Sequence, residues 1–137
     1  MLNPAIVHIE DNQEISCLVR ELLAEGYAFR GCDVLSFSNI EDFQKWQNEK
    51  NRRVLLYITD GFFPKTRNGK IEELWHEVIE SVLKSTSGLG KVLLLSGTLP
   101  SLERLRRYSQ CEVYVADKDI LQTPDKFLEM LKCYTTR

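Results

Sequence analysis

Acidic side chains follow two short apolar runs of the sequence, each at the point where the run ends. Glu10 and Asp11 follow the run 5–9, and Asp60 follows the run 54–59. If both runs are strands of one parallel sheet, the three carboxylates lie at the edge where open α/β sheets bind their ligands. Neighbouring carboxylates repel one another unless a cation lies between them, and oxygen ligands with room for water suit Mg²⁺. The residue types therefore predict a magnesium site.

A hydroxyl and an ammonium group follow two further apolar runs. Ser96 ends the run 92–96, and Lys118 comes two residues after the run 112–116. A lysine and a hydroxyl beside a metal site can hold the equatorial oxygens of a phosphoryl group. Together with the acids, they predict metal-assisted phosphoryl transfer onto Asp60. The alternative is that each of these residues is an ordinary polar group at a solvated strand end.

Five apolar runs that predict strands alternate with five segments that predict helices. The expected strands are residues 5–9, 33–37, 54–60, 92–96 and 112–116. The run before Asp60 is apolar almost throughout, which is typical of a central strand buried on both faces. The alternation predicts an α/β fold with a parallel sheet covered by helices on both faces, in a single domain over residues 1–137.

Capping residues and apolar periodicity predict where the helices lie. The expected N-caps are Asn12, Ser38 (in a capping box with Glu41), Ser101 and Thr123. The third helix is expected to bury one face made of Ile71, Leu74, Trp75, Val78, Ile79 and Val82. Residues 87–91 have a faint likeness to a phosphate loop, but they precede a strand and are interpreted as a connector.

Composition and charge exclude several classes of protein. The chain of 137 residues has a net charge of −2, so bulk electrostatics do not indicate nucleic acid binding. The four cysteines are too widely spaced to suggest a zinc site or a disulfide framework, which favours reduced thiols in a cytoplasmic protein. No apolar run reaches the length of a membrane span, and the first residues do not have the pattern of a signal peptide.

Four short motifs, each at a predicted strand end, make the chain similar to a known family. They are Ile9–Asn12, the D-x-x-x-P spacing of Asp60 and Pro64, Leu95–Gly97, and Lys118. With these residues the chain resembles the receiver domain of two-component response regulators over essentially its whole length. The resemblance implies a flavodoxin-like, five-stranded parallel sheet in the order 2-1-3-4-5.

The resemblance also implies roles for individual residues. Asp60 resembles the phosphoacceptor, Ser96 the hydroxyl that follows the phosphoryl group, and Lys118 the lysine that pairs with it. The implied protein ligands of Mg²⁺ are Glu10, Asp11, Asp60 and the backbone carbonyl of Phe62. The implied phosphodonor is a histidine kinase or a histidine phosphotransfer protein. The implied output is contact with a downstream protein through helix 4, strand 5 and helix 5, without direct nucleic acid or membrane binding.

Three departures from the family pattern are visible. Asp119 follows Lys118, where the family commonly has proline after a cis peptide bond. Val115 occupies the usual place of a switch aromatic, and Tyr114, one residue earlier, is expected to point to the other face of the sheet. The loop from Pro64 to Gly69 is one residue longer than the usual form. Apart from these departures, Phe62 and Thr98 stand at the two places that flank the path of the hydrolytic water in receivers.

Other functions remain open on the same fold. The missing aromatic and Asp119 favour a non-phosphorylated module that only binds other proteins, whereas the intact acidic set and Lys118 oppose it. A flavin-binding protein is a third possibility, but Glu10 and Asp11 would repel the flavin phosphate. A phosphatase with an aspartate nucleophile would need a second aspartate two residues after Asp60, where this chain has Phe62.

Overall fold

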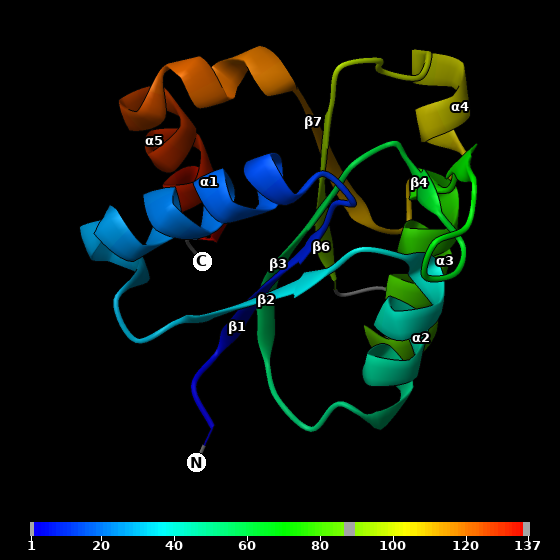
Figure 1. Cartoon of the computed structure of the whole chain (residues 1–137), viewed down its shortest axis with the longest axis horizontal. Helices are drawn as coiled ribbons and strands as arrows, with labels where there is room; N and C mark the ends of the chain where they lie inside the picture. Colours follow the sequence, from blue (N-terminus) through cyan, green and yellow to red (C-terminus); the bar gives the residue numbers. More distant parts are fainter. Residues whose placement is uncertain (1, 87–89, 136–137) are drawn as a thin grey trace.

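A five-stranded parallel sheet forms the centre of the molecule in the computed structural model, which describes residues 2–86 and 90–135 (Figure 1). Its strands are β1 (Ala5–Ile9), β2 (Asp33–Phe37), β3 (Val54–Thr59), β6 (Lys91–Ser96) and β7 (Glu112–Asp117). Their spatial order is β2-β1-β3-β6-β7, and every pair is parallel. Counted along this sheet alone, the order is 2-1-3-4-5, so the predicted flavodoxin-like fold is confirmed.

Helices cover both faces of the sheet. They are α1 (Gln13–Glu25), α2 (Ile40–Glu49), α3 (Trp75–Thr86), α4 (Leu102–Arg106) and α5 (Pro124–Thr135), with the 3₁₀ turns η1 (Tyr27–Phe29) and η2 (Lys118–Gln122). In Figure 1, α1 and α5 lie on one side of the sheet and α2 and α3 on the other. No helix within residues 2–86 and 90–135 is long and apolar enough to cross a membrane.

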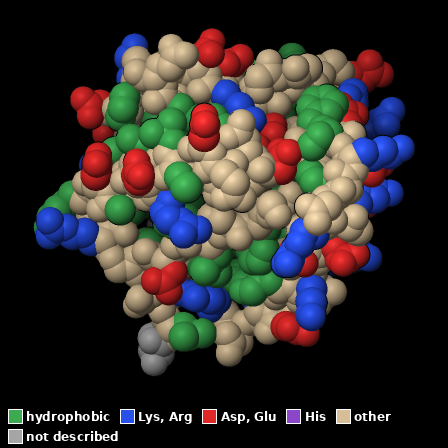
Figure 2. All heavy atoms as spheres, viewed as in Figure 1, with side chains coloured by type: hydrophobic (Ala, Val, Ile, Leu, Met, Phe, Trp, Pro, Cys, Tyr) green, Lys and Arg blue, Asp and Glu red, His purple; other side chains and the backbone are tan. Residues whose placement is uncertain are grey.

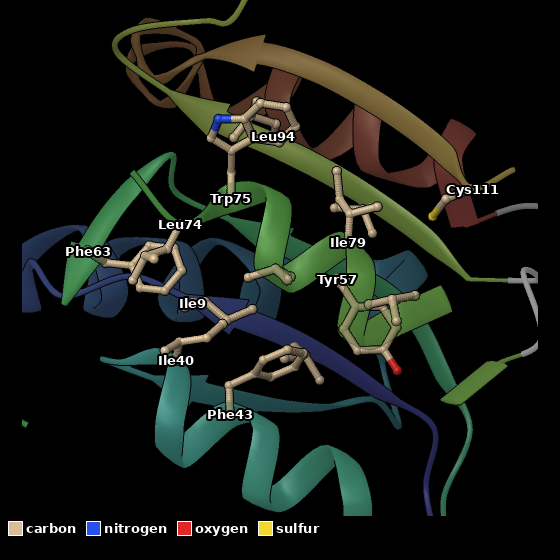
Figure 3. Close-up of a cluster of buried hydrophobic side chains, with 14 residues drawn as sticks. Ile9, Ile40, Phe43, Tyr57, Phe63, Leu74, Trp75, Ile79, Leu94 and Cys111 are labelled. Carbon is tan, nitrogen blue, oxygen red and sulfur yellow. The ribbon is translucent and has the colours of Figure 1, made fainter. Parts of the chain in front are cut away.

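Alternating residues of the central strands supply a separate hydrophobic core on each face. On β3, Tyr57 packs into the core beneath α2 and α3, whereas Leu56 and Ile58 pack beneath α1 and α5. Figure 3 shows the first of these cores, in which the rings of Phe43 and Tyr57 have centroids 6.0 Å apart and Trp75 lies nearer to Leu94. The predicted burial of β3 on both faces is confirmed, and it fixes the residue that follows the strand in space.

Most of the predicted helix starts are confirmed. The side chain of Asn12 accepts from the backbone amides of Glu14 and Ile15, and Ser101 accepts from that of Arg104. Thr123 directly precedes the first residue of α5, although its hydroxyl donates to the carbonyl of Ile120.

The predicted cap of the second helix was wrong by one residue. Asn39, not Ser38, accepts the hydrogen bond from the backbone amide of Asp42. The side chain of Asn39 also donates to the Asp42 carboxylate, so the buried amide is satisfied at both of its ends. The Asn39 amide makes the two bonds through separate atoms, since Oδ1 accepts from the Asp42 amide and Nδ2 donates to the Asp42 carboxylate.

The predicted start of the third helix was also wrong. Ile71 lies in a short strand, β5 (Ile71–Glu73), which pairs antiparallel with β4 (Phe62–Pro64), and α3 begins at Trp75. Between the two strands, Asn68 has a φ of 64° in a turn closed by a hydrogen bond from Gly69 to Thr66. The chain therefore forms a two-stranded ribbon directly after Asp60. The connector predicted at residues 87–91 has residues 87–89 outside the described part of the chain.

Candidate functional site

The candidate site lies at the carboxyl edge of the sheet, where four adjacent strands end. Asp60 follows β3, and its backbone amide donates to the carbonyl of Ile9, the last residue of β1. Glu10 and Asp11 directly follow Ile9, so the acids after β1 and the acid after β3 are neighbours. Ser96 is the last residue of β6 and is in register with Asp117, the last residue of β7. Lys118 directly follows Asp117.

The three predicted acids form one cluster. One carboxylate oxygen from each of Glu10, Asp11 and Asp60 lies within 4.8 Å of the others. Glu10 and Asp60 are 3% and 7% exposed, whereas Asp11 is only half-buried, so the cluster opens to solvent on the Asp11 side. Three oxygen donors with an open side fit a small, hard divalent cation that keeps part of its water shell.

Lys118 lies between two of the acids. Its Nζ is 2.7 Å from Oε1 of Glu10 and 3.1 Å from Oδ2 of Asp60. These contacts join the residues that directly follow three separate strands through a single ammonium group. In this arrangement the lysine offsets part of the negative charge of the cluster.

The turn after β7 fixes the position of Lys118. The carboxylate of Asp117 accepts a hydrogen bond of 2.9 Å from the backbone amide of Asp119 and caps η2. A proline at position 119 would have no such donor. The described chain contains no cis peptide bond, so the Lys118–Asp119 peptide is trans.

Burial changes the proton affinity of the charged groups at the site. Burial raises the pKa of Glu10 to about 7, against the opposing effect of its hydrogen bond to Lys118. Burial alone would lower the pKa of Lys118, but the bond and charge of Glu10 and the charge of Asp60 raise it above its ordinary value. Lys118 therefore stays protonated at neutral pH, as an ammonium group that binds phosphoryl oxygens must.

The Asp60 carboxylate is held at both oxygens. Oδ2 faces Lys118, and Oδ1 accepts a 2.7 Å hydrogen bond from the backbone amide of Gly61. A Cβ at position 61 would come within 3.0 Å of Oγ of Ser96, so the absence of a side chain lets the buried serine lie against this loop. Ser96 Oγ also accepts from the backbone amide of Thr98 at 3.3 Å.

The structure places most of the predicted residues in one cluster and the others only near it. Glu10, Asp11, Asp60 and Lys118 are in one cluster, and Ser96 lies beside Gly61. Phe62 is the first residue of β4, where it pairs with Glu73, and the role of its carbonyl as a metal ligand stays a prediction.

Sequence reasoning missed two supporting residues. Gly61 and Asp117 position Asp60 and Lys118, and the D-x-D spacing of Asp117 and Asp119 was the signal for the second of these. His8 of β1 is packed beside the site and is 1% exposed. Burial, followed by the charge of Lys118, lowers the pKa of His8 to about 4.

Tyr114 points away from the face that Val115 occupies, as predicted. Its ring stacks on Tyr134 of α5 with centroids 3.9 Å apart, and its hydroxyl donates to Glu112 at 2.7 Å. Val115 is 39% exposed on the other face. The aromatic ring at this strand is therefore packed against α5 and does not face the site.

Comparison with known proteins rests on structure alone. No protein-family model matches the chain, and no curated protein matches it. Among solved structures, CheY4, a chemotaxis protein of Vibrio cholerae, has a TM-score of 0.70 at 14% identity, with 96% of this chain and 98% of that chain covered. The phosphorylated cyanobacterial phytochrome response regulator RcpA has a TM-score of 0.68 at 17% identity, with 96% and 90% covered.

A third similar structure contains a divalent metal. The Mn²⁺-bound form of the response regulator Rcp1 has a TM-score of 0.66 at 15% identity, with 90% of this chain and 91% of that chain covered. At these identities the likeness establishes the fold. The chain accordingly has the fold of response regulator receiver domains, with an acidic cluster and a lysine at the carboxyl edge of its sheet.

Proposed function

We propose that the protein is a phosphoacceptor module of two-component signalling, in which Asp60 takes a phosphoryl group from a phosphohistidine. The donor is a histidine kinase or a histidine phosphotransfer protein. The observation that carries the proposal is the contact of Lys118 Nζ with both Glu10 and Asp60, beside an acidic cluster on a receiver fold. Such a lysine can pair with a phosphoryl group placed on Asp60.

In the proposed reaction, one carboxylate oxygen of Asp60 attacks phosphorus in line with the bond to the donor imidazole. A phosphorus–oxygen bond forms, the phosphorus–nitrogen bond breaks, and the imidazole nitrogen keeps the electron pair. Lys118 holds one phosphoryl oxygen by an ion pair, and the Ser96 hydroxyl is close enough to the Asp60–Gly61 loop to donate to another. The residues act by positioning and by charge, which is how proteins catalyse most of phosphoryl transfer.

The acidic cluster fits Mg²⁺ as the cofactor. Glu10, Asp11 and Asp60 would hold the ion through carboxylate oxygens, with the Phe62 carbonyl as a further ligand. When bound, Mg²⁺ offsets the negative charge that builds up between the acids and the incoming phosphoryl group.

We further propose a cytoplasmic location and an output through contact with a downstream protein, on the surface of α4, β7 and α5. A second candidate function is a non-phosphorylated module that binds proteins on this fold. The packing of Tyr114 against Tyr134 favours it, because a ring held in a stack cannot act as a rotamer switch.

Phosphotransfer from a panel of phosphorylated histidine kinases and histidine phosphotransfer proteins, with Asp60→Asn as control, tests the proposal. We expect Mg²⁺-dependent transfer to the wild-type chain and none to Asp60→Asn. Equal labelling of wild type and Asp60→Asn would contradict the assignment of Asp60.

A further inference from the structure

A groove of about 540 Å³ lies beside the acidic cluster, between the strand-end loops and the ribbon of β4 and β5. Asp11, Gln13 and Ser38 line it from the loops after β1 and β2, and Arg67 and Ile71 line it from the ribbon. Asp11 also belongs to the acidic cluster, so the groove opens directly onto the candidate site.

The ribbon brings basic and apolar side chains to this groove. Lys65, Arg67 and Lys70, near its tip, are exposed, and Ile71 is 55% exposed. Figure 2 shows Lys and Arg side chains gathered along the right-hand edge of the view, where Figure 1 places the ribbon and α4. Arg67 therefore brings a positive charge to the lining of the groove, which also contains Asp11, and this suits an anionic group that approaches the acids.

The loop between β4 and β5 is fixed to the first turn of α2. The backbone amide of Glu41 in that turn donates to the carbonyl of Lys65, and at the base of the ribbon the amide of Leu74 donates to the carbonyl of Gly61. The guanidinium of Arg67 is 3.6 Å from the carboxylate of Asp42, and 78% of this arginine side chain is exposed. Arg67 is thus held near the groove while most of its surface stays accessible to a partner.

We propose that the groove receives the phosphohistidine-bearing segment of the protein phosphodonor, with Arg67 meeting its phosphoryl group and Ile71 packing on an apolar side chain of the same segment. This inference rests on the proposed function of Asp60, and the bonds made and broken are those given there. The ribbon is then a docking element that selects a protein donor.

The test compares two donors on the same variants. One is the phosphorylated panel protein that transfers fastest to the wild type, and the other is phosphoramidate, which brings no protein segment to the groove. The quantity compared is the ratio of two values, kcat/KM for the protein donor and the rate constant for phosphoramidate. We expect this ratio to fall by about tenfold in Arg67→Ala and by about a hundredfold in Arg67→Glu. Ile71→Ser should lower the same ratio, and Arg67→Lys should restore most of it.

Matched controls separate docking from general effects of charge or fold. Arg53→Ala removes an exposed arginine that precedes β3 at the opposite edge of the sheet, and Leu2→Ser removes an exposed apolar side chain that precedes β1 at the same edge. Both should keep the wild-type ratio. An unchanged ratio in Arg67→Glu and Ile71→Ser overturns the proposal, as does a panel in which no protein donor transfers while phosphoramidate labels Asp60. Failure of both donors on the wild type instead refutes the proposed function.

Discussion

Glu73 and Arg104 form a two-point ion pair that joins β5 to α4. One guanidinium nitrogen donates to Oε2 of Glu73 at 2.9 Å, the other pairs with Oε1, and the guanidinium lies 5.3 Å from the ring centroid of Trp75. β5 pairs with β4, and β4 starts two residues after Asp60. The ion pair therefore links the chain that follows Asp60 to α4. It is a structural path from the candidate site to the proposed output surface.

Glu73→Gln should weaken this link. An amide keeps the shape of the side chain but loses the charge that makes an arginine pair strong. We expect faster hydrogen exchange of the β4–β5 amides, with Leu74 included, and smaller chemical-shift changes in α4 on binding a phosphoryl analogue. Arg106→Ala, which removes a neighbouring exposed arginine of α4, is the control. The same exchange rates in Glu73→Gln and wild type would show that the ion pair does not hold the ribbon.

His8 should make the metal-free protein sensitive to acid. Its pKa of about 4 in the folded state lies below the ordinary value of 6.5, so below pH 6.5 the unfolded chain binds a proton that the folded chain does not. The contribution of His8 to the free energy of unfolding should therefore fall as the pH drops, by about 2 kcal/mol between pH 7.5 and pH 5. Over the same range the raised pKa of Glu10, about 7, acts in the opposite direction, because the folded chain then takes up a proton at Glu10 before the unfolded chain does. The difference between wild type and His8→Leu in urea unfolding at both pH values therefore isolates the effect of His8.

The control for His8 is the second histidine of the chain, His76, which is partly exposed in α3. His8→Leu should remove most of the extra loss between pH 7.5 and pH 5, and His76→Gln should keep it. If His8→Leu has the same pH dependence as the wild type, the acid sensitivity does not come from His8.

Lys118→Met should have opposite effects on metal binding and on phosphorylation. Removing an ammonium group about 3 Å from the acids should tighten Mg²⁺ binding by about tenfold, because a like charge no longer opposes the cation. It should slow phosphorylation by about a hundredfold, since a charged donor to the phosphoryl group is lost. Calorimetric Mg²⁺ titration and phosphoramidate labelling measure the two effects. Weaker Mg²⁺ binding in Lys118→Met would contradict the placement of this lysine.

Phe62→Asn should speed loss of the phosphoryl group. Phe62 is half-buried at the start of β4, and its apolar ring cannot orient a hydrolytic water, while Thr98 offers only a neutral hydroxyl. An amide at position 62 could hydrogen-bond this water, and we expect dephosphorylation about tenfold faster, equivalent to about 1.4 kcal/mol of barrier. The decay of the phosphorylated protein after donor removal measures it. A wild-type phosphoryl group that is lost within seconds, and no faster in Phe62→Asn, would rule out a guarding role for Phe62.

The parallel sheet and the four strand-end motifs were predictable because their signals are local and repeated. The strand that ends at Thr59 is an apolar run followed by Asp60, and the apolar run of β6 ends at Ser96 itself. Parallel strands place such residues at one edge, so Asp60, Lys118 and the acids could be grouped from the sequence alone.

The ribbon and the details of the caps were not predictable in the same way. Strands of three residues, such as β4 and β5, are too short for a periodic signal, and Ile71 is three residues from Leu74, which also fits a helix. The shift from Ser38 to Asn39 depends on two simultaneous hydrogen bonds to Asp42. The Lys118–Asp119 peptide is trans, the ordinary form before a residue other than proline, and the cap that Asp117 supplies to the next turn was not recognised in the sequence.

In the proposed function, Asp60 carries the phosphoryl group. The direct test is incubation with phosphoramidate in Mg²⁺ or in EDTA, followed by intact-mass measurement and by borohydride trapping with peptide mapping. We expect the added mass of one phosphoryl group in Mg²⁺ only. This mass should be lost on treatment with hydroxylamine, should map to Asp60 and should be absent from Asp60→Asn. A wild-type protein with no added mass in Mg²⁺, or the same added mass in Asp60→Asn, would contradict it.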